Sequence, residues 1–311
     1  MQSYIILTDS GSDFSQSKAQ EVDVNVIDLF VTVEGEEPVP NSKMDIKKLY
    51  SLLRDKKKAS TSAVNLDDFI KTMTHFLEEG KDILYIGFSS GLSSTYSAGN
   101  CAAEELREKY PDRKIYTVDS LCASLGQGLL VYFAGKMRLD GASIEEVRDF
   151  VKNSKLNLCH WFTVDDLFFL KRGGRVSAAT AVVGTVLGIK PVMHVDNEGK
   201  LIKVSTVRGR KSSIDALFDK LKSDMLALKD NLEDIASDVR SGISSILKLP
   251  SDLRKTVFIS HGDCEDDANY LANRLKNELN IKNVFIDFVG TVIGSHSGPG
   301  TLAIFYLGTA R

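Results

Sequence analysis

The first 158 residues alternate short apolar runs with longer segments of helical spacing, and this alternation restricts the chain to few folds. Apolar runs typical of buried strands occupy 4–8, 24–33, 81–88 and 114–120. The segments between them repeat apolar side chains every three or four residues, as amphipathic helices do. Strands that alternate with helices predict an α/β domain with a mostly parallel sheet.

The rest of the chain follows another pattern, which predicts a second α/β domain with a mixed sheet. Residues 189–209 read as a hairpin with its turn at Asp196–Gly199, and a long helical stretch continues to about Leu249. We expect two domains, 1–160 and 161–311. Because no spacer rich in Pro, Ser or Gly separates them, the domains should pack closely, with a ligand between them.

Composition and charge argue against several classes of protein. The net charge is −3, so no general attraction to nucleic acid or anionic membrane is expected. No apolar run approaches the roughly 20 residues of a membrane span, and the first residues do not resemble a signal peptide. The four cysteines are far apart and form no C-x-x-C pair, so a reducing, cytoplasmic compartment is expected.

The stretch Gly87-Phe88-Ser89-Ser90-Gly91 matches G-x-S-x-G, the nucleophile turn of α/β-hydrolases. In those enzymes the helix starts at once after the serine, whereas here helical spacing begins only at about Tyr96. Ser93 is therefore the expected helix N-cap. A hydrolase that uses Ser89 or Ser93 with His296 remains an alternative function.

A serine-rich turn at a helix N-terminus can also bind an anion through free N–H groups and hydroxyls. Two similar turns are Ser60–Ser62, before a predicted helix, and Gly294–Gly300, between predicted strands. The second contains His296 among glycines and serines. Plain helix caps and an exposed loop would explain the same residues without a ligand.

Other motifs suggest neither a metal nor a cofactor. Asp9-Ser10-Gly11-Ser12-Asp13 lacks the third acidic ligand of a hard-cation site, so a turn and helix cap are expected there. The single Arg172-Gly173-Gly174-Arg175 element has no neighbouring aromatic repeat that would indicate RNA binding. The sequence carries no P-loop or other phosphate-binding motif of a nucleotide site.

Seven short motifs, taken in order along the chain, resemble the DegV family. They are ILTDSGSD, TSAVN, SSGLSSTYSA, VDS, FLKRGGR, IKPV and IGSHSGPG. The family includes the fatty-acid-binding subunit of bacterial fatty acid kinase. The resemblance implies a lipid-binding subunit that is not itself an enzyme. It would bury one long-chain fatty acid and present the carboxyl group to a separate ATP-binding kinase subunit, which forms an acyl phosphate.

The resemblance also implies roles for individual residues. The carboxylate-binding residues would be Thr61, Ser93 and His296. Two arginines linked to engagement of the kinase would be Arg175 and Arg208, although Arg210 lies only two residues from the second. Supporting residues of the head-group turns would be Ser62, Ser94, Gly294 and Ser295. The sequence departs from the family at the TSAVN motif, at Ser94 and in the long segment 211–255.

These assignments agree with the chemistry of the side chains. Two hydroxyls, a helix N-terminus and an imidazole can satisfy a carboxyl group that would be costly to bury unpaired. The acyl chain needs an apolar slot, whose wall could include residues 177–188 and 168–170; plain core packing would explain both segments equally well. Arg175 follows a glycine pair and Arg208 ends a predicted strand, so we expect both arginines to be exposed.

Overall fold

A four-stranded parallel sheet forms the centre of the N-terminal part of the protein. The computed structural model describes residues 4–177, 188–230 and 237–311, with the side chains of 226–241 outside the description. The strand order is β2 (Val24–Ile27), β1 (Tyr4–Asp9), β6 (Asp82–Gly87) and β7 (Ile115–Asp119). One face packs against α3 (Leu66–Glu78) and α4 (Thr95–Lys109), and the other against α1 (Gln16–Glu21), α5 (Leu125–Leu139) and α6 (Ile144–Ser154). The sheet is therefore buried on both faces, as parallel sheets usually are.

A small antiparallel sheet beside it corrects two predictions. It consists of β4 (Val39–Pro40), β3 (Phe30–Val33) and β5 (Ala59–Ser62), next to α2 (Ile46–Arg54). The run 24–33 was predicted as one strand, but it divides after Ile27 between two sheets. The Leu29 N–H at the division donates to Ser10 Oγ over 2.9 Å, a contact that no local pattern predicts. The residues around Thr61, predicted as a turn, form β5.

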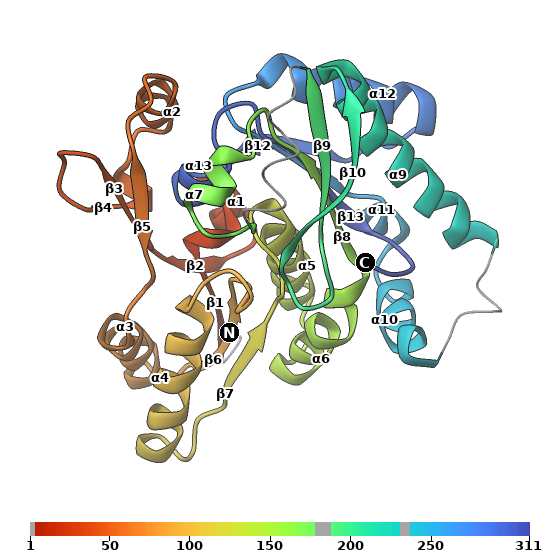
Figure 1. The fold of residues 1–311 in the computed structure, drawn as a ribbon. Helices are drawn as coiled ribbons and strands as arrows, with labels where there is room; N and C mark the ends of the chain where they lie inside the picture. Colours follow the sequence, from red (N-terminus) through yellow and green to blue (C-terminus); the bar gives the residue numbers. More distant parts are fainter. Residues whose placement is uncertain (1–3, 178–187, 231–236) are drawn as a thin grey trace.

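The second part of the chain forms the expected mixed sheet, with six strands (Figure 1). Their order is β10 (Leu201–Arg208), β9 (Ile189–Val195), β8 (Leu158–Thr163), β13 (Leu302–Leu307), β11 (Val257–His261) and β12 (Val284–Phe288). Only β11 and β12 pair in parallel. The predicted hairpin turn is confirmed, because the Gly199 N–H donates to Asp196 O over 2.9 Å.

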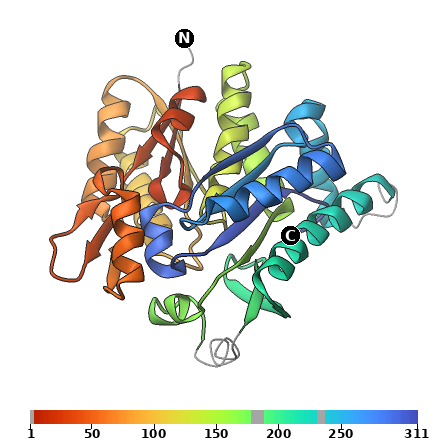
Figure 2. The same cartoon turned by 90° about the horizontal axis from the view of Figure 1, so that it is seen from above.

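The four-stranded parallel sheet and the six-stranded mixed sheet share one hydrophobic core. α5 packs against strands of both sheets, so Leu129 and Phe133 belong to the same cluster of buried side chains as Ile6 and Phe305. In Figure 2 the N-terminal elements and the six-stranded sheet lie side by side around α5. One face of the six-stranded sheet takes part in this core. The other is covered by α9 (Arg210–Asp230) and α12 (Glu265–Leu279).

The other helices of the described residues are shorter than α9 and α12. They are α7 (Phe168–Arg172), α10 (Ser237–Leu247), α11 (Ser251–Arg254), α13 (Thr291–Ser297) and the 3-10 turns η1 (Ser10–Ser12), η2 (Asn41–Lys43) and η3 (Lys155–Asn157). Within the described ranges, no helix combines the length and the apolar character needed to span a bilayer. Residue 160 lies within β8, so the division of the chain at 160/161 stays a prediction.

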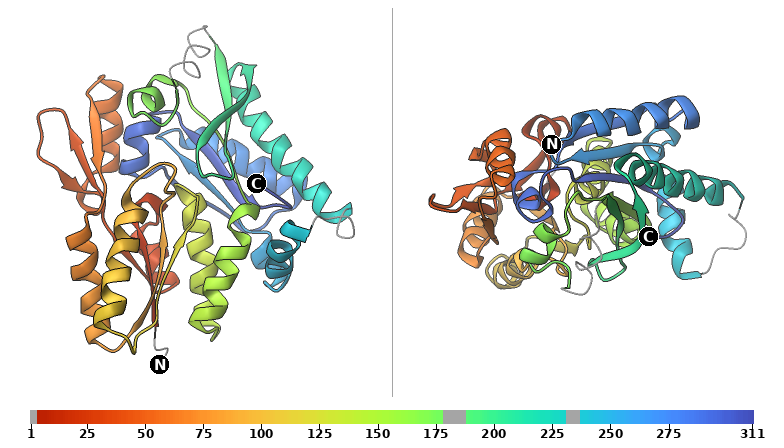
Figure 3. Two further views of the ribbon diagram at one scale, coloured as in Figure 1. Left: turned by 60° about the horizontal axis from the view of Figure 1, so that its bottom comes forward. Right: turned by 45° about the horizontal axis from the view of Figure 1, so that its top comes forward.

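α13 joins the end of the chain to its beginning and so determines where the site lies. It packs against α2, β3 and β5, as the left view of Figure 3 shows. The Tyr50 hydroxyl donates to Val289 O over 2.7 Å, and the Thr291 hydroxyl donates to Asn41 Oδ1 over 2.7 Å. Segment 294–300 was predicted as a turn, but its first four residues belong to α13. This helix places His296 beside β5.

Candidate functional site

A cavity of about 220 Å³ lies between the four-stranded parallel sheet and the six-stranded mixed sheet. On one side it is bounded by the loops that follow β6 and β7, at the carboxyl ends of the parallel strands, where ligands commonly bind in α/β sheets. On the other side it is bounded by the six-stranded sheet and α13. The described residues that line it are Leu29, Thr61, Ala63, Phe88, Leu92, Ser93, Ser94, Ala123, Ser124, His160, Phe162, Leu170, Arg175, Val195, Leu201, Ser260, Val289, Val292, Ile293, His296, Ser297, Thr301, Ala303 and Phe305.

Fourteen of the 24 described lining residues are apolar, and seven of the others carry a hydroxyl group. Aliphatic and aromatic side chains come from both halves of the protein. Among the described lining residues, Arg175 carries the only permanent charge. A ligand that fits such a lining has a long apolar body and a single negatively charged group, because buried charges require a partner.

Thr61 and His296 meet in the wall of the cavity. Thr61 Oγ1 and His296 Nε2 are 2.7 Å apart, although the residues are 235 positions apart in the sequence. Burial, and after it the positive charges of Arg175 and Arg172, lower the pKa of His296 to about 4. The imidazole is therefore neutral at pH 7 and acts as a hydrogen-bonding group rather than as a cation.

Ser93 and Ser94 line the same cavity directly before α4. Ser93 Oγ accepts a hydrogen bond from the Thr95 N–H over 3.2 Å and lies 2.9 Å from Thr95 Oγ1. The N-cap was predicted at Ser93, one residue early, because Ser94 occupies the cap position. The Ser94 side chain makes no cap hydrogen bond. The positive end of the α4 dipole nevertheless lies at this part of the cavity wall.

Arg175 corrects one expectation. It was predicted to be exposed, but it is partly buried and lines the cavity. Its Nε and Nη2 donate to Leu92 O over 3.3 and 3.2 Å, and its Nη1 donates to Gly173 O. Burial lowers the pKa of this guanidinium, which still remains charged at neutral pH. Because Arg175 lines the cavity, it can contact a ligand directly.

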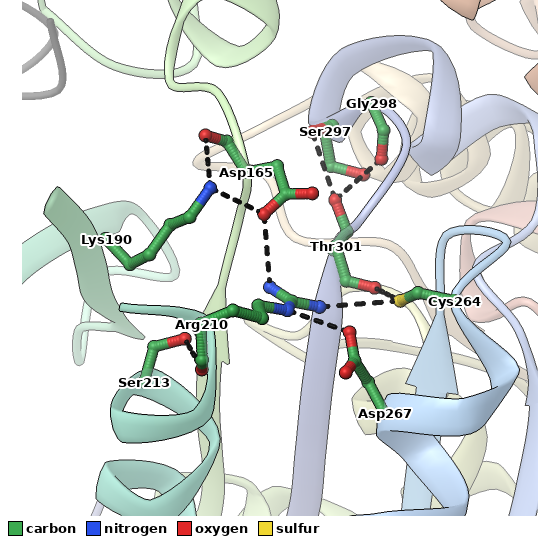
Figure 4. Close-up of polar contacts among 9 residues, drawn as sticks. All are labelled: Asp165, Lys190, Arg210, Ser213, Cys264, Asp267, Ser297, Gly298 and Thr301. Carbon is green, nitrogen blue, oxygen red and sulfur yellow. Dashed lines mark hydrogen bonds and ion pairs between the residues drawn. The ribbon is translucent and has the colours of Figure 1, made fainter. Parts of the chain in front are cut away.

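Arg208 and Arg210 have different surroundings. Arg208 is exposed at the end of β10, as predicted, and makes no hydrogen bond or ion pair to the described residues. Arg210 instead lies between two carboxylates in Figure 4. Its Nε donates to Asp267 Oδ2 over 2.8 Å, and its Nη1 lies 3.7 Å from Asp165 Oδ1. Lys190 also binds Asp165. Of these two arginines, Arg208 is the one without a partner among the described residues.

Three of the predicted supporting residues lie away from the cavity lining. Ser62 is exposed on β5, beside Thr61. The Ser295 hydroxyl donates to Thr291 O within α13 over 2.7 Å. Gly294 allows α13 to approach α2, since a Cβ there would lie 2.5 Å from the Tyr50 hydroxyl oxygen. Gly294 and Ser295 thus contribute to the structure and packing of the helix that carries His296.

Ser89, the serine of the G-x-S-x-G match, is fully buried. Its hydroxyl donates to Gly199 O over 2.8 Å and accepts from the Gly91 N–H over 3.2 Å. Gly199 has a φ of 73°, and a side chain there would collide with Ser89 Oγ. In the described structure Ser89 contacts no histidine through a hydrogen bond. The motif instead fixes the loop after β6 against the β9–β10 turn.

The motif at residues 9–13 has a similar structural role. Asp9 is fully buried and accepts hydrogen bonds from the Tyr85 hydroxyl and the Phe88 N–H, both over 2.8 Å. It also accepts from the Gly11 N–H over 3.0 Å, as the expected cap of a short helical turn. Among the described residues, no group of His, Cys, Asp and Glu side chains could hold a metal ion.

The predicted cavity walls are only partly tested. Residues 178–187, most of one predicted wall segment, lie outside the described residues. Of residues 168–170, only Leu170 lines the cavity, whereas Phe168 is 55% exposed. The sequence did not identify the lining residues of the mixed sheet, among them His160, Phe162 and Ser260. Alternation along each strand was the available signal, but it does not say which face meets a ligand.

Comparisons with known proteins agree with this architecture. A model of the DegV family, described as uncharacterised protein, matches residues 3–309. A DegV domain-containing protein of Clostridium perfringens is 39% identical over 313 residues, which cover 100% of this chain and 99% of the relative. A second one, from Streptococcus pyogenes, is 32% identical and covers 98% of each chain.

Two solved structures have the same mixed α/β fold. A DegV lipid-binding protein from Thermotoga maritima is 28% identical, with a TM-score of 0.78 and 100% of each chain covered. A DegV family protein from Thermus thermophilus, described as binding fatty acid, is 26% identical, with a TM-score of 0.80. Its match covers 99% of this chain and 100% of that one. The predicted fold class, a parallel sheet and a mixed sheet, is therefore confirmed.

Proposed function

The chain belongs to the DegV family, and we propose that its cavity binds one long-chain fatty acid. The observation that carries this proposal is the lining itself, which combines mostly apolar side chains with hydroxyl groups, a single cation among the described residues and the Thr61–His296 pair. The fatty-acid binding described for the Thermus thermophilus relative supports the same ligand class. The expectation that no metal or other cofactor takes part stays a prediction.

In this proposal the carboxylate lies at the Thr61–His296 pair. When His296 Nε2–H donates to Thr61 Oγ1, the threonine hydroxyl is free to donate to a carboxylate oxygen. Ser93 supplies a second hydroxyl, and Arg175 balances the charge in a region from which water is largely excluded. Hydrogen bonds to a charged group are stronger than neutral ones, which offsets the cost of burying the carboxylate.

The alkyl chain accounts for most of the expected affinity. Each methylene that leaves water contributes about 0.8 kcal/mol. The lining offers side chains such as Phe162, Val292 and Phe305 from elements on different sides of the cavity. A chain whose carboxylate lies at His296 can extend along these side chains toward Val195 and Leu201.

The bound carboxyl group is the proposed substrate of a separate kinase. One carboxylate oxygen would attack the γ-phosphorus of ATP held by the ATP-binding subunit. A C–O–P bond forms to give the acyl phosphate, and the bond from that phosphorus to ADP breaks. Arg208 would serve as a contact for the kinase, since it is exposed and unpaired within the described structure. The protein itself would contribute binding and orientation.

The proposed compartment is the cytoplasm. All four cysteines are free thiols, including the buried Cys122 and Cys159. Protein disulfides are uncommon in that reducing compartment, so free thiols agree with it. No nucleic-acid partner is proposed, because the net charge is −3.

A titration of lipid-free protein tests the binding function. We expect palmitic acid to bind at one molecule per chain by calorimetry, and hexadecanol, which lacks the carboxylate, to bind at least tenfold more weakly. Equal affinity for both ligands would contradict the proposed head-group site.

Turnover of a 4-nitrophenyl acyl ester distinguishes the alternative hydrolase. Ser93 and His296 both line the cavity, which is the observation that keeps this alternative open. We expect no turnover above the buffer rate. Turnover that is lost in Ser93→Ala would establish an enzyme.

A further inference from the structure

Thr95, the first residue of α4, carries a buried hydroxyl directly behind the cavity wall. Its side chain is fully buried and lies outside the cavity lining. Its Oγ1 lies 2.9 Å from Ser93 Oγ, and its N–H donates to the same oxygen over 3.2 Å. Among the described residues, Ser93 is the sole hydrogen-bonding partner of the Thr95 hydroxyl. Ser93, in contrast, lines the cavity and is only partly buried.

Burial decides which of these two hydroxyls donates to the other. If Ser93 donated, the hydroxyl hydrogen of Thr95 would be buried without an acceptor among the described residues, which is unfavourable. If Thr95 donates, its hydrogen is satisfied, and Ser93 can direct its own hydrogen into the cavity. A hydroxyl hydrogen rotates to suit its partners, so the second arrangement is the stable one. The Thr95 hydroxyl is therefore the donor, and Ser93 Oγ is the acceptor.

This arrangement restricts what the Ser93 hydroxyl can offer to a ligand. Ser93 Oγ accepts twice, from the N–H and from the hydroxyl of Thr95. Because a hydroxyl oxygen has two lone pairs, both are then occupied, and any further hydrogen bond uses the Ser93 hydrogen. The backbone is held as well, since the Ser93 N–H donates to Ser89 O over 3.1 Å. Ser93 thus presents a donor, and not an acceptor, to the cavity.

The Thr61–His296 pair follows the same rule. With His296 Nε2–H as the donor across their 2.7 Å contact, the Thr61 hydroxyl is also left as a donor. Each of the two hydroxyls is then oriented by a second group, which is His296 for Thr61 and Thr95 for Ser93. An ionised carboxylate only accepts hydrogen bonds, whereas an alcohol also has a hydrogen to donate. Two oriented donors therefore suit a carboxylate better than an alcohol.

We propose that Thr95 is a positioning residue of the head-group site, because its hydroxyl orients the hydroxyl of Ser93 as a donor to the carboxylate of the bound fatty acid. Thr95 itself does not contact the ligand. This inference rests on the proposed function, which places the carboxylate at Thr61, Ser93 and His296. It adds a residue that acts through Ser93 and a reason why the site prefers an ionised head group.

A double-mutant cycle in the lipid-free full chain tests this role, with the affinity for palmitic acid measured by calorimetry. Thr95→Val replaces the hydroxyl with a methyl group, and we expect palmitic acid to bind about fivefold more weakly. In the Ser93→Ala background the same change should alter the affinity by less than about twofold, because the hydroxyl that Thr95 orients is already absent. Thr95→Ser, which keeps the hydroxyl, should recover most of the affinity lost in Thr95→Val.

Two controls separate positioning from a general loss of structure. Thr117→Val removes a hydroxyl that donates to Asn100 Oδ1 outside the described lining, and it should keep the parental affinity. Hexadecanol should lose less affinity than palmitic acid in Thr95→Val, since hydrogen bonds to a charged acceptor are the stronger ones. Circular dichroism checks the fold of each variant. If Thr95→Val does not fold, Thr95→Ala takes its place in the cycle.

The outcomes distinguish the failure of this inference from the failure of the proposed function. If the parent protein binds palmitic acid and Thr95→Val binds it equally well, the positioning role is overturned and fatty-acid binding stands. The same holds if Thr95→Val causes an equal loss with and without the Ser93 hydroxyl, or an equal loss for palmitic acid and hexadecanol. If the parent protein binds no palmitic acid, the proposed function fails, and the positioning role fails with it.

Discussion

His296 and His160 are two neutral, buried histidines in one cavity, and they differ in how they are held. His296 pairs with Thr61 and lies close enough to Arg175 for the cation to lower its pKa. His160 forms no hydrogen bond to the described residues through its ring, which is held by packing against Phe305 and the backbone at Gly126. The difference teaches that residue type does not determine a role. The hydrogen-bonding partner of His296 suits the proposed head-group site, whereas the ring nitrogens of His160 are closed off by packing.

The largest expected effect is on stability at acid pH. His296 has a pKa of about 4 in the folded protein and about 6.5 when unfolded, so the unfolded chain binds the proton first as pH falls. His296 by itself should therefore lower the free energy of unfolding by roughly 2–3 kcal/mol as the pH falls from about 6.5 to 4. The buried Asp13, whose pKa is raised to about 8, changes the free energy of unfolding in the opposite direction over this range. Urea unfolding of ligand-free protein at several pH values measures the profile.

Two variants isolate the contribution of His296 to that profile. His296→Gln should lack this contribution, so on acidification it should lose roughly 2–3 kcal/mol less of its free energy of unfolding than the parent protein does. His75→Gln, at a side chain that is 69% exposed, is the control variant. If His296→Gln and the parent protein lose the same free energy on acidification, the imidazole is not held neutral as described.

The next largest effect is on ligand affinity. Ser93→Ala combined with His296→Ala removes one proposed donor to the carboxylate and the imidazole that orients the Thr61 hydroxyl. The double change should weaken palmitic-acid binding about 100-fold, or roughly 2.7 kcal/mol. Calorimetry gives the affinity, and circular dichroism checks the fold. Ser62→Ala is the control, since Ser62 neighbours Thr61 but lies outside the lining. Unchanged lipid occupancy in the double variant would place the head group elsewhere.

Arg175→Gln should have a smaller effect on the same affinity. It removes the single permanent charge of the described lining but keeps a side chain that can donate to Leu92 O. We expect palmitic acid to bind about tenfold more weakly and hexadecanol to bind equally well, since an alcohol gains little from a cation. Equal losses for both ligands would instead indicate that Arg175 acts by holding the cavity wall together.

The smallest expected effect on lipid binding is that of Arg208→Ala. Arg208 is exposed and outside the lining, so palmitic-acid affinity should change by less than about twofold. Formation of acyl phosphate should slow when the kinase subunit and ATP are added. A docking defect would be greatest at low kinase concentration. Phosphorylation at the parental rate would remove Arg208 from the kinase contact.

The sequence predicted the elements of the fold better than their relations. The βα alternation predicted the parallel sheet, and turn chemistry predicted the 196–199 hairpin. Neither pattern showed that the run 24–33 divides between two sheets, because that division depends on a contact between Leu29 and Ser10. Thr61 and Ser93 were identified through the resemblance. Their convergence with His296 depends on α13, which reads as a loop in the sequence.

Burial explains most of the remaining errors at the site. Arg175 follows two glycines, a local context typical of exposed turns, yet the carbonyls of Leu92 and Gly173 make a partly buried guanidinium favourable. His160 lies in a strand whose pattern shows alternation but not which face borders a cavity. The burial of Arg175 and the position of His160 beside the cavity depend on elements that are distant in the sequence, so local patterns do not predict them.

The most direct measurement for the central claim is solvent extraction of the purified protein, followed by mass spectrometry and quantification of fatty acid per chain. The account predicts close to one long-chain fatty acid per chain. It also predicts that Ser93→Ala with His296→Ala retains much less, while Ser62→Ala retains the parental amount. A folded protein that yields no fatty acid and takes up none on incubation would contradict a cavity built for a carboxylate and an alkyl chain.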